Sequence, residues 1–194
     1  GHYWLSGVAL QTGEIRWTSE RFTVAEDFPE AVVADDHRVY LPVGNRIQAF
    51  DHDGEPLWNE PVSSRNPNQE GWPYVWRMAH AGSRLIVELA TYEAPNEYYA
   101  LDATTGAVQW QRTDLWRQPV VAGDVVYARR DVEVEEGRFV TDLYELDVES
   151  GETRGTHRFD GRLRFQPRVA GGRVFVVVDE PVDSAASVRV VAMA

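Results

Sequence analysis

The sequence lacks cysteine and lysine, and it contains no long apolar run. Without cysteine, the chain can form no disulfide and offers no thiolate as a metal ligand or a catalytic nucleophile. No apolar stretch approaches the roughly 18 residues that cross a bilayer as a helix. No basic segment precedes an apolar stretch, as it would in a signal peptide. We therefore expect neither a transmembrane segment nor a signal peptide in these residues.

The charge is strongly one-sided. The 19 basic residues are all arginine and stand against 31 acidic residues, which gives a net charge of −12. Because such a surface repels phosphate backbones, nucleic acid is not an expected partner. An acidic, lysine-free composition is typical of a halophile or of a GC-rich genome, and the sequence leaves both explanations open. Apolar residues make up 43% of the chain, enough to form a buried core.

One phrase recurs along the chain. It reads "ALDATTGAVQW" at 100–110, "ALQTGEIRW" at 9–17, "AFDHDGEPLW" at 49–58 and, in a degraded form, "ELDVESGETRG" at 145–155. Its glycines are separated by 41, 52 and 45 residues, and they are Gly13, Gly54, Gly106 and Gly151. The residues four positions beyond these glycines are Trp17, Trp58, Trp110 and Gly155. The fourth copy has therefore lost its tryptophan.

The phrase predicts two strands joined by a tight turn. Its glycine accepts the positive φ that such a turn needs, and the preceding Asp51, Asp102 or Asp147 can accept backbone N–H groups across it. A second hairpin precedes the later copies, as in "MAHAGSRLIVEL" at 78–89, upstream of the full copy at 100–110. In the third repeat we expect strands near 75–79, 84–91, 97–102 and 107–112. No segment shows the 3.6-residue apolar period of a helix.

Four strands per repeat, with a period in the forties, are typical of the blades of a β-propeller. The predicted fold class is therefore all-β, a propeller of four-stranded antiparallel blades with about four repeats in this chain. We treat 1–194 as a single propeller domain or propeller segment. Its repeats fall at approximately 1–20, 21–60, 61–113, 114–158 and 159–194.

At these copies the chain resembles the PQQ-like (quinoprotein-type) β-propeller repeat family, whose docking phrase is Ala-x-Asp-x-x-Thr-Gly-x-x-x-Trp. The resemblance extends over almost the whole chain. It implies that each tryptophan locks one blade to its neighbour. The residues with this structural, blade-docking role are Trp17, Trp58, Trp110, Gly13, Gly54, Gly106 and Gly151. Gly155 departs from the phrase, which implies a weaker or differently filled contact at that blade.

The number of blades has two interpretations. Members of this family usually have about seven or eight blades, within the general range for propellers. The chain is then part of a larger ring, whose other blades belong to the same parent chain. In the alternative, the strand around 14–18 completes the C-terminal blade and closes a small ring. We favour the larger ring, because repeat arrays need neighbours or caps to bury both faces.

The longest irregular insert, at 59–78, carries the candidate partner-binding residues. These are Trp72, Tyr74, Trp76 and Arg77. Exposed aromatic and arginine side chains are the usual anchors of protein interfaces. The alternative is that Tyr74 and Trp76 lie on an inner strand and only pack there.

Other polar clusters do not predict chemistry. "DHDG" at 51–54 is a hairpin turn that lacks the second half of a calcium loop. The histidine of "DDH" at 35–37 has no partner histidine at metal-binding spacing. "DVEVEEG" at 131–137 suits a solvated ribbon between two strands. We therefore predict no catalytic, cofactor-binding or metal-binding residue and no cofactor, and we expect that the chain is not an enzyme.

The sequence favours a non-enzymatic propeller that scaffolds an unidentified protein or small-molecule partner. The resemblance implies an extracytoplasmic location: secreted, periplasmic or cell-surface. The alternative function is a segment of a PQQ-dependent dehydrogenase, whose members hold a quinone and calcium with residues from several blades. A purely structural segment of a larger extracellular chain is a third reading.

Overall fold

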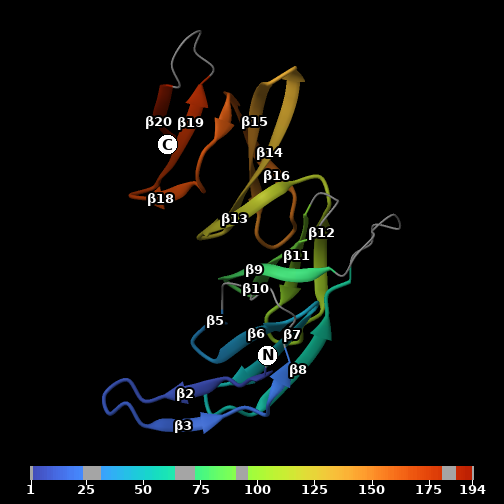
Figure 1. The fold of residues 1–194 in the computed structure, drawn as a ribbon, viewed down its shortest axis with the longest axis vertical. Helices are drawn as coiled ribbons and strands as arrows, with labels where there is room; N and C mark the ends of the chain where they lie inside the picture. Colours follow the sequence, from blue (N-terminus) through green and yellow to red (C-terminus); the bar gives the residue numbers. More distant parts are fainter. Residues whose placement is uncertain (1, 24–31, 64–72, 91–95, 181–186, 194) are drawn as a thin grey trace.

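The computed structural model describes residues 2–23, 32–63, 73–90, 96–180 and 187–193. All regular elements in these ranges are β-strands, and they form a series of small antiparallel sheets. Figure 1 shows these sheets following one another along an arc, with β2 and β3 near one end and β19 and β20 at the other. The predicted fold class, an all-β propeller built from four-stranded antiparallel blades, is confirmed.

The strands group into blades in chain order. The first segments are β1 (His2–Tyr3), β2 (Ser6–Val8), β3 (Ile15–Thr18) and β4 (Phe22–Thr23). The second blade consists of β5 (Val33–Ala34), β6 (Arg38–Val43), β7 (Arg46–Asp51) and β8 (Pro56–Pro61). The third consists of β9 (Tyr74–Ala81), β10 (Arg84–Ala90), β11 (Glu97–Asp102) and β12 (Val108–Arg112). The fourth consists of β13 (Trp116–Ala122), β14 (Val125–Glu135), β15 (Arg138–Asp147) and β16 (Thr153–Asp160).

The fifth sheet departs from this pattern at its inner edge. Strands β17 (Arg162–Leu163) and β18 (Arg168–Ala170) both pair with β19 (Arg173–Glu180), at its two ends. They are therefore two pieces of one interrupted inner strand. The other edge of β19 pairs with β20 (Ser187–Met193). Strand β20 is therefore the third strand of this sheet, counted from the inner edge.

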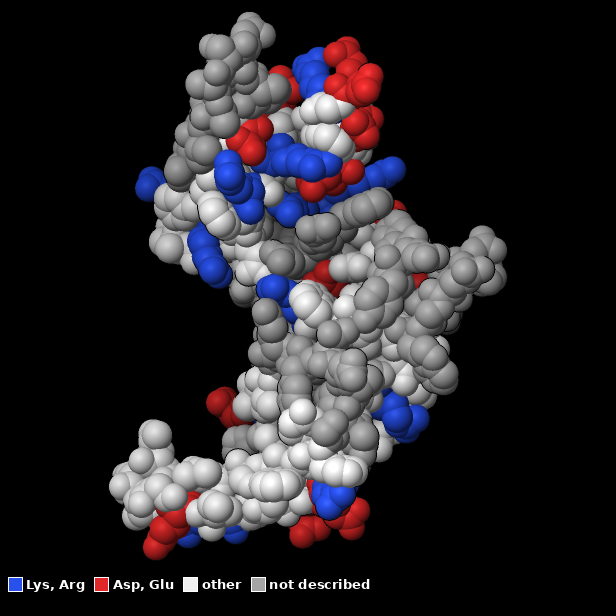
Figure 2. All heavy atoms as spheres, in the orientation of Figure 1, with Lys and Arg blue, Asp and Glu red and all other residues white. Residues whose placement is uncertain are grey.

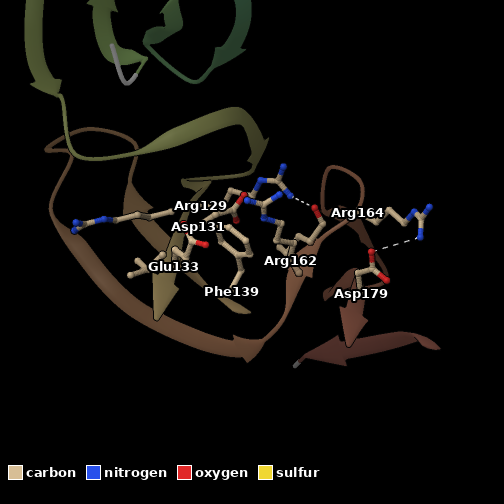
Figure 3. A pocket seen from close by; sticks show the side chains of 10 residues that line it. Arg129, Asp131, Glu133, Phe139, Arg162, Arg164 and Asp179 are labelled. Carbon is tan, nitrogen blue, oxygen red and sulfur yellow. Dashed lines mark hydrogen bonds and ion pairs between the residues drawn. The ribbon is translucent and has the colours of Figure 1, made fainter. Parts of the chain in front are cut away.

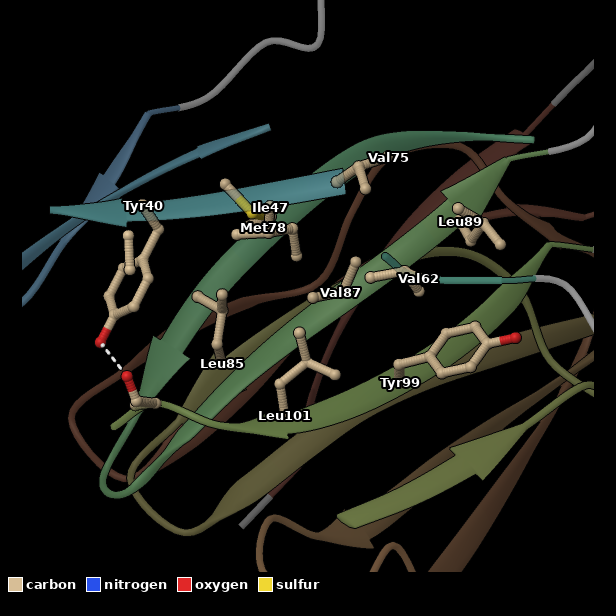
Figure 4. Close-up of a cluster of buried hydrophobic side chains, with 12 residues drawn as sticks. Tyr40, Ile47, Val62, Val75, Met78, Leu85, Val87, Leu89, Tyr99 and Leu101 are labelled. Carbon is tan, nitrogen blue, oxygen red and sulfur yellow. Dashed lines mark hydrogen bonds between the residues drawn. The ribbon is translucent and has the colours of Figure 1, made fainter. Parts of the chain in front are cut away.

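The third blade shows why the sequence forms sheets buried on both faces. Side chains alternate between the two faces of a strand. On β10, Leu85 and Val87 pack with the second blade, whereas Ile86 packs with the fourth. Because neighbouring blades cover both faces, the strand reads as a nearly continuous apolar run. Figure 4 shows the first of these two cores, in which Ile47 of the second blade lies against Met78 and Leu85 of the third.

The N-terminal strands do not close a small ring. Strand β3 pairs with β2, and β1 pairs with β4. Strand β20 pairs with β19 in a separate sheet at the opposite end of the arc (Figure 1). The alternative in which residues 14–18 complete the C-terminal blade is therefore wrong for this structure. The geometric reason is that the successive sheets turn too gradually to bring these two strands together.

Candidate functional site

The repeated turn is held by its aspartate. In the third blade, Asp102 Oδ1 accepts the N–H groups of Thr104 and Thr105, each at 2.9 Å. Gly106 then adopts φ +75°, in the left-handed region. Burial by itself raises the pKa of Asp102, but the hydrogen bonds from Thr105 and Thr104 outweigh it and the pKa is lowered. Asp51 and Asp147 accept turn N–H groups in the same way, as the sequence predicted.

Each tryptophan of the phrase lies against the corresponding turn of the next sheet. Trp17 donates its indole N–H to the carbonyl of His52 at 2.7 Å. Trp58 donates to Ala103 at 3.2 Å, and Trp110 donates to Val148 at 2.8 Å. The indole therefore covers the neighbouring turn with its apolar ring while its one polar group is satisfied.

The turn glycines leave room for these rings. A Cβ atom added at Gly54 would lie 2.5 Å from the ring of Trp17, and one added at Gly151 would lie 2.6 Å from the ring of Trp110. At Gly106 the corresponding distance to Trp58 is 2.7 Å. Gly13 has the same type of backbone, with φ +72°, but nothing in the described structure lies within 4 Å of its added Cβ. Its turn accepts no indole here.

The residue opposite each tryptophan in the register explains the degraded fourth copy. Trp17, Trp58 and Trp110 pair with Gly7, Ala49 and Ala100, respectively. In the fourth blade the pair is Gly155 and Glu145. The large and small residues have thus changed places, and a Cβ at Gly155 would lie 3.1 Å from Glu145 Oε2. The expectation of a differently filled contact agrees with this arrangement.

Neighbouring Arg154 joins two carboxylates beside this turn. It donates to Asp124 at 2.7 Å and also to Asp147. The N–H of Ser150, followed by Arg154, lowers the pKa of Asp147 to about 2. Beside the missing indole, the fourth blade therefore carries an exposed network of charges within its own sheet.

The fourth and fifth blades are joined by buried polar groups instead. The hydroxyl of Thr141, which has no exposed surface, lies 2.9 Å from the carbonyl of Gly161 and accepts the N–H of Leu163 at 3.3 Å. Arg129, only 9% exposed, donates Nη1 to the carbonyl of Leu163. Gly161 adopts φ +130°, and an added Cβ would collide with the backbone of Asp179. Only glycine permits this close crossing.

Asp35 is the centre of a second polar group, between the second and third blades. Its carboxylate accepts the Tyr40 hydroxyl at 2.7 Å and the N–H groups of His37 and Arg38. Burial raises the pKa of Asp35, but these hydrogen bonds, together with the nearby His80, lower it to about 2. The Tyr40 hydroxyl also lies 3.2 Å from the Ala103 carbonyl (Figure 4), the same acceptor that Trp58 uses.

The predicted partner-binding residues are only partly described. Trp72 lies outside the described residues. Tyr74 and Trp76 both lie on β9, the inner strand of the third blade, and their rings meet edge to face with centroids 5.8 Å apart. These two side chains and that of Arg77 are half-buried. Their role in binding stays a prediction.

A cavity of about 750 Å³ lies between the fourth and fifth blades. Four arginines, three acidic residues and three apolar residues line it. In Figure 3, Phe139 lies beside Arg162, and Arg164 and Asp179 are paired nearby. The guanidinium carbon of Arg162 is 3.3 Å from the centroid of the Phe139 ring, a cation–π contact.

The sequence interpretation missed this cavity. Its lining comes from strands that lie up to 50 residues apart, between Arg129 and Asp179. The available signal was local charge, because residues 157–194 hold six arginines and only four acidic residues in an acidic chain. In Figure 2, most of the arginine atoms visible on this face lie over the last two blades.

The acidic segment at residues 131–137 forms part of a hairpin. Residues 131–137 continue β14 and turn into β15 as an exposed ribbon, as predicted, and Glu133 accepts the N–H of Gly137 at 2.9 Å. Within the described ranges, no group of three or more His, Asp or Glu side chains is placed to hold a metal ion. Nor do these ranges contain a helix that could span a membrane.

Two solved structures share the fold over nearly the whole chain. A europium-containing methanol dehydrogenase matches 92% of this chain with a TM-score of 0.59 and 10% identity. The quinohemoprotein alcohol dehydrogenase ADHIIG from Pseudomonas putida HK5 matches 91% with a TM-score of 0.58 and 10% identity. The present chain spans 44% and 36% of the lengths of those two proteins. No curated protein matches it in sequence.

A family model supplies the sequence relationship. The model described as outer membrane protein assembly factor BamB matches residues 5–130 and 99–192, and its two overlapping matches are what a repeat array produces. Together with the indole-docked blades, this match shows that the chain belongs to the PQQ-like β-propeller repeat family.

Proposed function

We propose that the chain is part of a non-enzymatic propeller that binds a partner outside the cytoplasm. The observation that carries the proposal is the half-buried Tyr74–Trp76 pair on an inner strand of a rigidly docked blade, with Arg77 beside it. Aromatic rings with little rotational freedom bind at low entropic cost, and loops and edges on rigid scaffolds are common binding sites. The matched family, whose described member acts in outer membrane protein assembly, supports an extracytoplasmic scaffold.

Affinity capture tests this proposal. The chain is immobilised and exposed to a periplasmic or secreted fraction, and the bound protein is compared between wild type, Trp76→Ala and Tyr74→Ala. Trp4→Ala is the matched control, because Trp4 is 61% exposed and lies far along the chain from the third blade. A partner that binds wild type and the control but not Trp76→Ala is expected. Equal capture by all variants would remove this surface as the interface.

We further propose that the chain belongs to a larger ring. Each indole docks on the turn of the following repeat, and the turn at Gly13 is the one among the four that accepts none. Val8, Leu10 and Ile15 on the same hairpin are exposed. A preceding repeat of the parent chain would cover both features. The two dehydrogenase structures, of which this chain spans less than half, are consistent with that size.

The parent gene provides the test of ring size. We expect further copies of the Thr-Gly…Trp phrase upstream of the first residue. In the longer protein, Gly13→Ala should then be as destabilising as Gly54→Ala, whereas in the present chain it should cost only the backbone strain. A parent that begins near residue 1 would contradict the larger ring.

The second candidate function is part of a PQQ-dependent dehydrogenase, favoured by the two structural relatives, which are alcohol-oxidising enzymes by name. The family resemblance implies a quinone held with a metal ion, calcium in many members, and the first of these relatives is europium-containing by name. The described part of this chain offers no cluster of three or more His, Asp or Glu, so these residues do not fit that site and we assign no step to it. Titration with the quinone and calcium, followed by absorbance and dye-linked alcohol oxidation, distinguishes the two functions. A saturable signal would overturn the scaffold proposal.

A further inference from the structure

The cavity between the fourth and fifth blades has the size of a small-molecule site and a mostly charged lining. Its volume of about 750 Å³ falls within the roughly 300–1,000 Å³ that is typical of ligand pockets. It combines a phenyl ring with four guanidinium groups, although the whole chain carries 12 more acidic than basic residues. A concentration of arginine in such a chain points to recognition of negative charge.

Two of the three acidic residues in the lining already have partners within their own hairpin. Asp131 Oδ1 lies 2.8 Å from the Thr141 hydroxyl, and Glu133 Oε1 accepts the N–H of Gly137 at 2.9 Å. These contacts tie the two carboxylates to β14 and β15. The third, Asp179, contacts Arg164 at 3.5 Å, a long and half-exposed pair that a better acceptor can displace at little cost.

Arg162 is the side chain best placed to meet a ligand. It is exposed, and its guanidinium carbon lies over the Phe139 ring, 3.3 Å from the ring centroid. Among the side chains that the structure describes, no carboxylate lies within 4.0 Å of its guanidinium nitrogens. The ring holds the guanidinium over its face, and the N–H donors of Arg162 have no carboxylate partner that would compete with a ligand in the cavity.

The backbone at this point is fixed as well. Gly161 can lie against Asp179 only because it has no side chain, and the Thr141 hydroxyl contacts its carbonyl at 2.9 Å. Arg129 holds the carbonyl of Leu163, the residue after Arg162. Arg162 is therefore mounted on a short strand that buried polar groups of the other blade hold from both sides. A binding group positioned in this way loses little freedom when a ligand arrives.

We propose that this cavity binds a small oxyanion, a carboxylate or a phosphate, through the guanidinium groups of Arg162 and Arg164, with Phe139 as the platform under Arg162. Arginine recognises both anions with two parallel N–H donors. Because the rest of the surface is acidic, anions gather here and are repelled elsewhere.

Calorimetric titration at low ionic strength tests the proposal on the intact chain. The probes are inorganic phosphate and succinate, which separate a phosphate ligand from a dicarboxylate ligand. Wild type should bind at least one of them saturably. Arg162→Gln should weaken that binding by about tenfold or more, the loss expected for a charge-assisted hydrogen bond. Arg168→Gln is the control, because it removes the same charge from β18 outside the cavity.

Two further variants keep the test decisive if Arg162→Gln unfolds. Arg164→Gln removes the second donor, and Phe139→Leu removes the platform without changing charge. Both should weaken the same titration, while circular dichroism and the unfolding midpoint report whether the fold is intact. Absence of saturable heat with both probes would overturn the proposal. Equal weakening by Arg168→Gln would also overturn it, since the effect would then be that of net charge alone.

Discussion

The junction between the third and fourth blades and the junction between the fourth and fifth blades hold similar sheets in different ways. At the first, Trp110 covers the turn at Gly151 and donates to the Val148 carbonyl. At the second, no described indole docks, and Thr141 and Arg129 bind backbone carbonyls of the fifth blade. Apolar packing accompanies both junctions. The comparison shows that the docking phrase is one solution among others for joining blades.

The two solutions place their contacts at different parts of the sheet. The indole acts at the turn that joins the third and fourth strands, where it buries a large apolar surface. The polar links act near the crossing from β16 to β17, and the arginine-lined cavity lies beside them. A sealed apolar contact leaves no room for a ligand, whereas polar links can stand next to one. We expect the two junctions to respond differently to substitution.

Removal of the docked indole should have the largest effect. Trp110→Ala should reduce the free energy of unfolding by about 3–4 kcal/mol, because it deletes a large packed ring and leaves the Val148 carbonyl without its donor. Urea denaturation measures this loss. Trp4→Ala, which removes an indole that is 61% exposed, should cost much less. Similar losses for the two variants would mean that docking on the neighbouring turn adds no stability beyond that of an exposed indole.

The glycine under the ring should show the next largest effect. Gly151→Ala should cost about 3 kcal/mol, the sum of strain at φ +71° and displacement of the Trp110 ring. Gly123→Ala is the matched control, with φ +60° and nothing within 4 Å of the added Cβ. It should cost only the strain, about 1 kcal/mol. Thermal or urea unfolding of both variants isolates the contribution of the ring. Equal costs would contradict the docking geometry.

The junction between the second and third blades combines both solutions, because Trp58 and Tyr40 share the Ala103 carbonyl and Tyr40 also binds Asp35. The pKa of Asp35 is lowered to about 2 in the folded state. A lowered folded-state pKa stabilises the protein above the unfolded-state pKa, near 4, and this contribution disappears as the pH falls toward 2. The side chain is 7% exposed, so the shift converts to about 2 kcal/mol at neutral pH.

Asp35→Asn should therefore destabilise the chain by about 2 kcal/mol at pH 7 and have little effect near pH 2. Urea unfolding across this pH range measures the difference. Asp36→Asn removes the same charge at the exposed neighbouring residue and is the matched control for net charge. If the two variants give parallel stability curves, the polar group around Asp35 does not contribute to this junction.

The polar junction should show the smallest of these effects. Thr141→Val keeps the side-chain shape but removes the hydroxyl that contacts the Gly161 carbonyl and Asp131, at a cost of about 1–2 kcal/mol. Thr156→Val, an exposed substitution on β16, serves as the control. The same pair can be compared by hydrogen exchange, in which Thr141→Val should expose the fifth blade before the fourth. Unchanged protection would show that apolar packing alone holds this junction.

The fold could be predicted because its determinants are local and repeated. The strands expected near 75–79, 84–91, 97–102 and 107–112 are observed at Tyr74–Ala81, Arg84–Ala90, Glu97–Asp102 and Val108–Arg112. A turn aspartate and a positive-φ glycine act within a few residues, so all four copies show the glycine and three of them show the aspartate. The sequence shows that glycine replaces tryptophan at position 155. It does not show that Glu145 lies opposite Gly155, because this pairing depends on the strand register.

The cavity and the polar links could not be predicted in the same way. Thr141 and Gly161 lie 20 residues apart, and Arg129 and Leu163 lie 34 apart, in segments with no shared motif. Their contacts depend on how two blades cross, which is a property of the assembled sheets. The arginines at 162, 164 and 168 were visible as a local excess of charge. The sequence did not show that the three acidic residues of the cavity lie near Arg162 and Arg164.

The direction of docking has a consequence for how such proteins change in length. Each repeat that keeps its tryptophan presents a ring to the unit after it, and the turn glycine of that next unit leaves room for the ring. Units that keep both the ring and the glycine present compatible surfaces to one another, so duplication or loss of one of them restores a matching pair at the new boundary. A gene that encodes them can grow or shrink in steps of one unit while every existing contact is preserved.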